Sequence, residues 1–420
     1  MPEILARQPV HTVYGGAHLF APDTPAKLGA IALRALRDYA PDAAALAAVL
    51  DLDRALSERI YPRVVAKLER EPVEDYRLDF EDGFGSRPDE EEDAVARQAA
   101  ERVAAGLVSG TLPARVGIRI KTLSDDSLAR RSLRTFDLFL ASLVAATGGR
   151  FPSGFVVTLP KVTAPAQVGR LAAACDAFEA ANGLPPGSLS LEVMVETPQA
   201  VFSPDGRAAL PGLVAEGRGR VAGAHFGAYD YTASLGITAA HQHMLHSACD
   251  FARHMMQVSL ADTGIWLSDG ATNIMPVPPH RAPQGGVLSA SERAANAAAV
   301  HSAWRAHARQ IRHSLVQGFY QGWDLHPGQL PIRFAAVYAF FLEGLTPTSE
   351  RLKNFVAKAA QATLVGGVFD DAATGQGLLN YFLRAMSCGA MAEPEAVELS
   401  GLTLDEIRSR SFAAIVAGRR

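Results

Sequence analysis

The feature that most constrains the fold is a regular alternation of short apolar runs with longer helical segments. Runs of this kind are typical of β-strands, and the segments between them carry apolar residues at helical spacing. The eight runs lie at 11–14, 76–80, 115–120, 154–159, 188–196, 221–227, 264–267 and 322–325. Strands that alternate with helices favour a parallel sheet, and eight of them fit a closed barrel. A doubly wound sheet is the rival, but no Gly-x-Gly-x-x-Gly motif follows the first run. The sequence therefore predicts an α/β fold, a (β/α)8 TIM barrel with a C-terminal helical extension.

The pattern also predicts how the chain divides. Residues 1–330 carry the eight runs and are assigned to the barrel, with a helical insertion near 40–72. The helix expected over 44–68 is predicted to break near Tyr61-Pro62. From 331 to 420 only helical segments follow, and they are expected at 333–342, 349–364, 377–386 and 403–416. This C-terminal part is interpreted as a helical extension that packs on the barrel or caps its mouth.

Composition narrows the class of protein. Hydrophobic residues make up 48% of the chain and charged residues 20%, which is an ordinary globular balance. The formal net charge of −4 argues against a nucleic-acid partner and against binding to anionic membranes. No uncharged apolar run approaches the ~20 residues of a membrane span, and no secretion signal is evident. Three widely spaced cysteines form no metal or disulfide framework. A cytoplasmic protein is predicted.

Two carboxylates stand at the ends of successive predicted strands. Glu196 ends the fifth run and is followed at once by Thr197-Pro198, and Asp230 follows the sixth run. In a parallel barrel the carboxyl ends of adjacent strands lie side by side at the mouth, where barrel enzymes place their chemistry. Carboxylate oxygens with water are the ligands that Mg²⁺ prefers. The sequence therefore predicts that Glu196 and Asp230 hold Mg²⁺.

Further charged residues fall at the same ends of other strands. Glu81 and Asp82 follow the second run, Arg119 and Lys121 end the third, and Lys161 follows the fourth. An acidic set flanked by cations suits a divalent ion that in turn binds an anionic substrate. The guanidinium group of Arg119 can grip a carboxylate with two parallel hydrogen bonds.

Each of these residues also has a structural interpretation. A single acid after a strand, such as Glu196 taken alone, is more often a turn or helix-cap residue. Arg119 is about as well explained as an ion-pair partner of the acids at 79–82, and Lys161 as an exposed side chain. The histidines of 241–246 lack His-Glu-x-x-His spacing, so they are interpreted as surface or core polar groups rather than zinc ligands.

Six short motifs in a fixed order carry a resemblance to a known family. They are Asp79-Phe80-Glu81-Asp82-Gly83; Arg119; Leu159-Pro160-Lys161-Val162; Glu196-Thr197-Pro198; Phe226-Gly227-Ala228-Tyr229-Asp230-Tyr231 with Leu235-Gly236; and Gly318-Phe319 with His326-Pro327-Gly328-Gln329. Together, over about residues 10–330, they resemble the citrate lyase β-subunit and malyl-CoA lyase superfamily of aldolase-type barrels.

The resemblance implies a reaction and a set of roles. It implies a carbon–carbon lyase or aldolase that acts through an enolate on a small oxo- or hydroxy-acid or its CoA ester, in a trimer or hexamer. It implies Mg²⁺ on Glu196 and Asp230. The catalytic residues implied are Arg119, which binds a substrate carboxylate, with Glu81 and Asp82 in or near the outer shell of the metal. The substrate-binding set is Arg119, Lys121, Lys161 and Gly227.

The sequence departs from that family in ways that leave alternatives open. Members that use acyl-CoA commonly have Arg-x-Asn on the third strand, whereas this chain has Arg119-Ile120-Lys121. Lys121 and Lys161 therefore also motivate a phosphoenolpyruvate-type phosphotransferase or hydrolase, and a non-catalytic metabolite-binding homologue is a third hypothesis. A catalytic acid from a lid is common in the family, but none is singled out among Glu343, Asp370 and Asp371.

Overall fold

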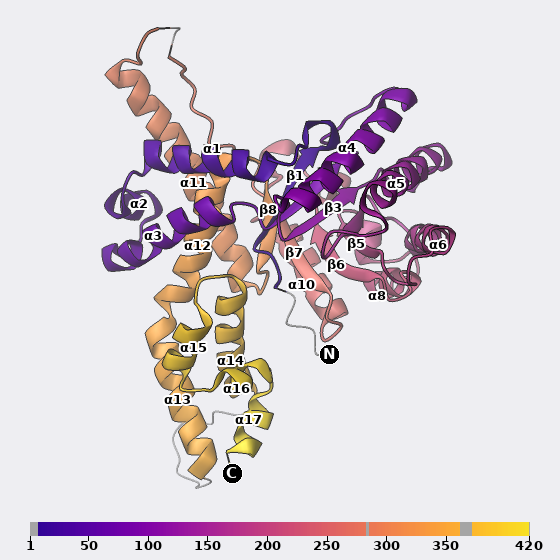
Figure 1. Cartoon of the computed structure of the whole chain (residues 1–420). Coiled ribbons are helices and arrows are strands. Elements are labelled where there is room, and N and C mark those ends of the chain that lie inside the picture. Colours follow the sequence, from indigo (N-terminus) through magenta and orange to yellow (C-terminus); the bar gives the residue numbers. More distant parts are fainter. Residues whose placement is uncertain (1–6, 283–284, 362–371, 420) are drawn as a thin grey trace.

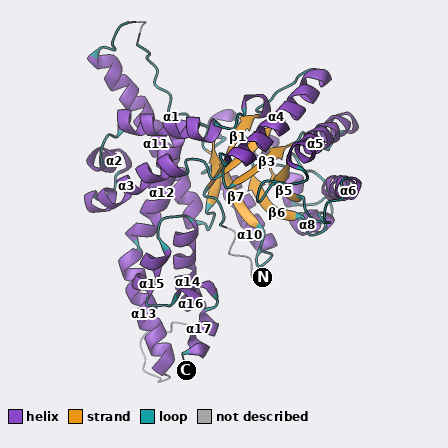
Figure 2. Cartoon of the chain, viewed as in Figure 1, coloured by secondary structure: helices purple, strands orange, loops and turns teal. Residues whose placement is uncertain are grey.

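Eight parallel strands close into a barrel in chain order. The computed structural model of the chain describes residues 7–282, 285–361 and 372–419. The strands are β1 (His11–Gly16), β2 (Asp75–Asp79), β3 (Arg115–Arg119), β4 (Val156–Leu159), β5 (Ser190–Val195), β6 (Val221–Phe226), β7 (Trp266–Ala271) and β8 (Gln321–Asp324). Each pairs in parallel with the next, and β8 pairs with β1. Figure 2 shows the strands gathered together, with helices on both sides of them. The predicted (β/α)8 barrel is confirmed.

Helices follow the strands and then continue alone to the C-terminus (Figure 1). They are α1 (Thr24–Tyr39), α2 (Ala43–Leu50), α3 (Arg54–Arg70), α4 (Asp89–Ser109), α5 (Asp126–Thr147), α6 (Pro165–Ala181), α7 (Pro198–Val201), α8 (Leu210–Glu216), α9 (Ala228–Ser234), α10 (Ser247–Leu260), α11 (Ala290–Val316), α12 (Leu330–Glu343), α13 (Leu345–Gln361), α14 (Ala372–Ser387), α15 (Glu393–Ser400), α16 (Leu404–Arg408) and α17 (Phe412–Gly418). Across the described ranges, no helix has the length and apolarity needed to cross a bilayer.

Some helix boundaries differ from the predicted ones. The break expected near Pro62 lies instead at 51–53, because Asp51 adopts a left-handed conformation (φ 54°) and the Asp53 carboxylate accepts the Leu56 N–H at the start of α3. Such end signals outweigh a single proline, which stays inside α3. The helix predicted over 403–416 is divided into α16 and α17. The last residues of the helix predicted over 349–364 lie outside the described residues.

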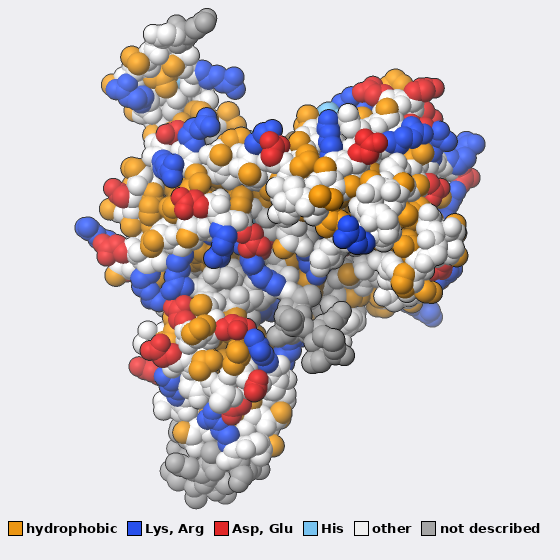
Figure 3. Space-filling model, in the orientation of Figure 1, with side chains coloured by type: hydrophobic (Ala, Val, Ile, Leu, Met, Phe, Trp, Pro, Cys, Tyr) orange, Lys and Arg blue, Asp and Glu red, His pale blue; other side chains and the backbone are white. Residues whose placement is uncertain are grey.

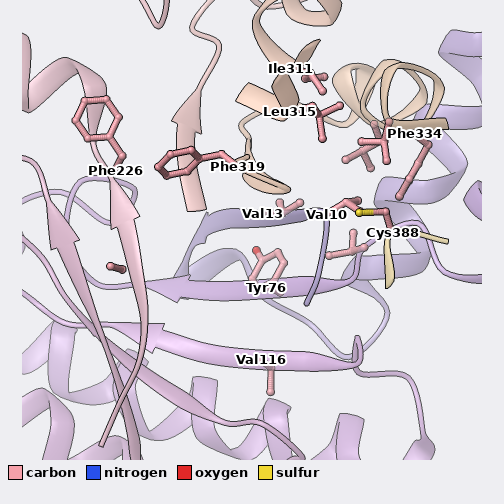
Figure 4. Close-up of a cluster of buried hydrophobic side chains, with 14 of the residues drawn as sticks. Val10, Val13, Tyr76, Val116, Phe226, Ile311, Leu315, Phe319, Phe334 and Cys388 are labelled. Carbon is pink, nitrogen blue, oxygen red and sulfur yellow. The ribbon is translucent and has the colours of Figure 1, made fainter. Parts of the chain in front are cut away.

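A continuous apolar core fills the space between the barrel wall and its helices. Figure 4 shows part of it, where Val13 and Tyr76 of the strands lie near Leu315 of α11 and Phe334 of α12. All four side chains are buried. The surface in Figure 3 instead carries acidic and basic side chains interspersed, without a large field of one sign on the face shown.

The C-terminal extension contacts the amino-terminal end of the barrel. In Figure 1 its helices lie below the strands. The Arg384 guanidinium donates to Gln8 Oε1 at 3.0 Å, and Gln8 in turn donates to Gln321 at the start of β8. An ion pair of 2.9 Å joins Arg63 of α3 to Glu395 of α15. The contact of α14 with Gln8 thus lies at the end of the barrel opposite to the predicted site, whereas Arg333 of α12 pairs with Asp324, the last residue of β8.

Candidate functional site

The carboxyl ends of β2, β4, β5 and β6 bring five predicted residues together. The Lys161 ammonium group hydrogen bonds to Glu81 and lies 3.2 Å from Asp82 Oδ2 and 3.6 Å from Asp230 Oδ2. The backbone N–H of Lys161 donates to Glu196 Oε1 at 2.6 Å. Four carboxylates, from the turn after β2, the end of β5 and the first turn of α9, therefore surround one cation at the barrel mouth.

Lys161 adopts a conformation that is rare for a residue with a side chain. Its φ is +50°, in the left-handed region, which costs of order 1–3 kcal/mol unless the surroundings enforce it. In this conformation the N–H reaches Glu196 while the side chain reaches Glu81. Burial by itself disfavours the charge, but the hydrogen bond that Lys161 donates to Glu81 and the nearby carboxylates raise the pKa of Lys161. Lys161 is thus held as an ammonium ion, a poor nucleophile for Schiff-base chemistry.

Glu196 is the most enclosed acid of the group. It is 1% exposed and directly follows β5, and the next residue, Thr197, caps α7 by accepting the Ala200 N–H. Burial, together with the Asp230 carboxylate, raises the pKa of Glu196 to about 8. A buried carboxyl group beside a second one is stabilised in its ionised form by a nearby cation.

Gly227 lets Glu196 occupy this position. A Cβ atom on Gly227 would lie 2.3 Å from Glu196 Oε2 and 2.5 Å from Glu196 Cβ. Its φ of −104° is open to any residue, so the requirement for glycine is space alone. Gly227 therefore leaves the space that the Glu196 side chain occupies. This role differs from the substrate contact predicted for it.

We expect Gly227→Ala to displace Glu196. The added methyl group forces the carboxylate or the β6–α9 turn to move, at a cost of about 1–3 kcal/mol, and should weaken Mg²⁺ binding. Urea denaturation and Mg²⁺ calorimetry measure the two effects. Gly212→Ala is the matched control, because its Cβ would meet only Pro165 Cγ at 3.8 Å. Equal Mg²⁺ affinity in the two variants would contradict this role.

Arg119 is paired with an acid in the barrel interior. Its Nε and Nη2 atoms donate to the two oxygens of Asp79 at 2.7 and 2.5 Å, and Nη1 lies 3.3 Å from Glu81 Oε2. Asp79 also accepts the N–H groups of Glu81 and Gly83 at 3.0 and 2.7 Å. One buried carboxylate thus holds both Arg119 and the acidic turn after β2. This is the ion pair that the sequence left open for Arg119, and it leaves only the Nη1 edge toward the mouth.

Lys121 does not join the cluster. Its ammonium group donates to the Phe80 carbonyl oxygen at 2.7 Å and to Glu92 Oε2 at 2.6 Å in the first turn of α4. Arg119 points into the barrel, whereas Lys121, which lies beyond the strand end, turns toward the helix layer. Of the lid acids considered, Glu343 pairs with Arg312 at 2.5 Å, and Asp370 and Asp371 lie outside the described residues.

A polar layer inside the barrel was absent from the predicted site. The Arg77 guanidinium donates to Glu192 at 2.6 and 3.0 Å, and His225 Nε2 lies 3.3 Å from the same carboxylate. Trp323 Nε1 donates to His225 Nδ1 at 3.2 Å. A signal was present in the sequence. Arg77 lies two residues before Asp79, and Glu192 lies four residues before Glu196, and residues an even number apart on a strand face the same side of the sheet.

The residues at the mouth fit a hard divalent cation. Glu196 and Asp230 offer two carboxylates, and Lys161 already stands among the acids as a substitute cation. Within the described part of the chain, no three His, Cys, Asp or Glu side chains form a ready-made metal site. A pair of carboxylates suits an ion such as Mg²⁺, which keeps several waters and takes only one or two carboxylates from a protein.

The pKa of Glu196 predicts how stability depends on pH without metal. Its unfolded pKa is near 4.5 and its folded pKa about 8, so both states are protonated below pH 4.5. As the pH rises toward 8 only the unfolded chain ionises, and the folded state loses about 1.4 kcal/mol per unit. In chelator, wild type should lose a few kcal/mol relative to Glu196→Gln between pH 5 and 8. Urea denaturation across this range measures it, and a constant difference would contradict it.

Comparisons with known proteins place the fold and the family. The family model described as "Domain of unknown function (DUF6986)" matches residues 3–415. A citrate lyase from Burkholderia xenovorans LB400 superposes with a TM-score of 0.57 at 19% identity, covering 94% of this chain and 98% of that one. The malate synthase of Haloferax volcanii, in a magnesium and glyoxylate complex, gives 0.47 at 13% identity, covering 98% and 97%. No curated protein matches the sequence. The citrate lyase supports the predicted resemblance at the level of the fold, and the chain belongs to the DUF6986 family.

Proposed function

We propose that this protein is a Mg²⁺-dependent carbon–carbon lyase or aldolase that acts through an enolate on a small oxo- or hydroxy-acid. The observation that carries the proposal is the placement of Glu196 and Asp230 at the ends of β5 and β6, with Gly227 shaped to receive the first of them. The fold shared with the Burkholderia citrate lyase supports it.

The acidic residues and the basic residues have different roles in this proposal. Glu196 and Asp230 would hold the metal, with water and substrate oxygens completing the shell. When bound, Mg²⁺ would offset the negative charge that develops on an enolate oxygen. The Nη1 edge of Arg119 and the Lys161 ammonium group supply positive charge for a substrate carboxylate. Glu81 and Asp82 accept hydrogen bonds from Lys161 and so orient it. They would also hold water in the outer shell of the metal ion.

Lys121 has a smaller part in this proposal than the sequence indicated. Its ammonium group lies against the Phe80 carbonyl oxygen and Glu92 of α4, away from the acids at the mouth, so the cations near the proposed metal ligands are Arg119 and Lys161. Lys121 and Lys161 together motivated the phosphotransferase or hydrolase alternative. With Lys121 away from the mouth, only Lys161 supports that alternative.

The test is a screen for carbon–carbon cleavage. The purified protein is incubated with short hydroxy-diacids and their CoA thioesters, with Mg²⁺ or with excess chelator, and the 2-oxo acid product is trapped as a hydrazone. We expect product with Mg²⁺ and loss of it in chelator. Full activity in chelator would contradict the proposal. Release of inorganic phosphate from phosphoenolpyruvate would favour the phosphotransferase or hydrolase instead.

A further inference from the structure

Two aromatic side chains fill the barrel axis next to the acidic cluster. Tyr14 of β1 and Trp323 of β8 lie with ring centroids 4.5 Å apart, and the Arg119 guanidinium carbon is 4.9 Å from the Tyr14 ring centroid. Tyr14 is in register with Arg77, one inward layer before Asp79, and Asp79 is in register with Arg119. The aromatic pair is therefore the layer directly beneath Arg119.

The space below this pair is filled. The Arg115 guanidinium lies 4.1 Å from the Trp266 ring centroid at the amino-terminal end of the barrel. Beside it the Gln8 amide donates to Leu267 O at 3.1 Å and to Gln321 Oε1 at 3.2 Å. Since this end is closed, the surface that Tyr14 and Trp323 retain faces the mouth.

The side chains of the barrel wall beside Tyr14 and Trp323 have little exposed surface. Met194 of β5 and His225 of β6, which are in register with each other, are 0% and 2% exposed. Tyr14 and Trp323 are only half-buried, in contrast. A molecule that enters between Arg119 and Glu196 thus meets these two rings at the bottom of the barrel mouth.

The ring of Tyr14, rather than its hydroxyl group, is the part that a molecule in the mouth can contact. The hydroxyl group is enclosed and, in the part of the chain that the structure describes, has no hydrogen-bond partner. The charges that act on it include Arg77 and Glu192 of the polar layer inside the barrel. The exposed fraction of Tyr14 therefore belongs to its ring.

We propose that Tyr14 and Trp323 form the floor of the substrate pocket and limit the length of the 2-oxo acid that binds there. This inference rests on the proposed function. The carboxylate and adjacent carbonyl oxygens of a 2-oxo acid can chelate a cation held by Glu196 and Asp230. The rest of the acid then points toward the floor, and each further methylene group must displace an aromatic ring. A filled apolar pocket discriminates against such a group by roughly 10- to 200-fold.

Intrinsic fluorescence tests where the acid binds. The chain has three tryptophans, and of these Trp323 is on the floor, Trp266 is at the closed end and Trp304 is fully buried against the Gly328 carbonyl oxygen. With Mg²⁺ present, we expect pyruvate to change the fluorescence of wild type and of Trp266→Phe. Trp323→Phe should lose this response and still bind pyruvate by calorimetry. A response that survives in Trp323→Phe would overturn the floor.

A size series tests the restriction itself. Affinities for glyoxylate, pyruvate, 2-oxobutyrate and 2-oxovalerate are measured by calorimetry in Mg²⁺. Trp323→Ala should raise the affinity for 2-oxovalerate relative to pyruvate by about 10-fold or more, and Trp266→Ala should leave the ratio unchanged.

The outcomes separate the two proposals. Binding of the acids with an unchanged size profile in Trp323→Ala would overturn the floor and leave the proposed function standing. Failure of wild type to bind any of the four acids with Mg²⁺ would overturn the proposed function, and the floor with it. If Trp323→Ala does not fold, the fluorescence comparison with Trp323→Phe still decides the matter.

Discussion

Replacing Glu196 by Gln should abolish Mg²⁺-dependent turnover while the barrel stays folded. The substitution keeps the shape of the side chain and its acceptor for the Lys161 N–H, so packing against Gly227 is retained. It removes the negative charge that a divalent ion requires. We expect Mg²⁺ affinity to fall by more than the ~10- to 100-fold that loss of an outer-shell partner costs. Calorimetry with Mg²⁺ and the chelator-sensitive cleavage assay measure the two losses.

Stability separates this effect from unfolding. Glu196 carries a raised pKa, so its neutral replacement should leave the metal-free protein at pH 8 as stable as wild type or more so. Glu398→Gln removes an exposed carboxylate of α15 and is the matched control, with no change expected in Mg²⁺ affinity. Asp230→Asn should reproduce the loss of turnover, because it removes the second carboxylate of the proposed metal site. Normal Mg²⁺ affinity in Glu196→Gln would exclude this residue as a ligand.

The fold was predictable because each strand carries its own local signal. Apolar runs bounded by glycine, proline or charged residues gave all eight strands, and a parallel barrel then follows from strands that alternate with helices. Helix ends were harder to place. The break at 51–53 depends on one left-handed residue, Asp51, and one capping carboxylate, Asp53. Such signals are single residues, and in the sequence they are less conspicuous than a proline such as Pro62.

The site was predictable only as far as topology determines it. Glu196, Asp230 and Lys161 meet because they follow strands that a barrel places together. The direction of each side chain depends on backbone angles that the sequence does not display. The positive φ of Lys161 aims its N–H at Glu196, and the residues beyond the end of β3 turn Lys121 toward α4. Lys161 and Lys121 therefore lie after the strands where the sequence predicted them, but their side-chain contacts could not be predicted.

The alternating charged residues of β2 were a signal of the barrel interior that the predicted site did not include. Asp75, Arg77 and Asp79 alternate along a strand that is buried throughout, so their charges must be paired inside the barrel. The structure pairs Arg77 with Glu192 and Asp79 with Arg119. An Asp at the last inward position of a strand is therefore a candidate for orienting an active-site arginine, as well as for binding metal.

Removing the Arg119 side chain should destabilise the fold as well as the site. Arg119→Ala leaves the carboxylate of Asp79, which is 1% exposed, without its cationic partner. Loss of one member of a buried ion pair costs about 3–5 kcal/mol, because the remaining charge is still desolvated. The backbone N–H groups of Glu81 and Gly83 continue to donate to Asp79 and should hold the cost near the lower end. Urea denaturation at pH 7 measures it.

A second substitution distinguishes the buried charge from the lost contacts of the arginine. In Asp79→Asn/Arg119→Met both charges are absent, so this double variant should recover part of the stability lost in Arg119→Ala. It should not recover substrate binding, because the Nη1 group that faces Glu81 is gone. Arg37→Ala is the control for removal of a guanidinium group, since its ion pair with Glu69 is 3.7 Å long and exposed, and a change within about 0.5 kcal/mol is expected. If the double variant were as unstable as Arg119→Ala, the cost would lie in packing against Tyr14 and Met194, and Asp79 would not need a cation to remain buried.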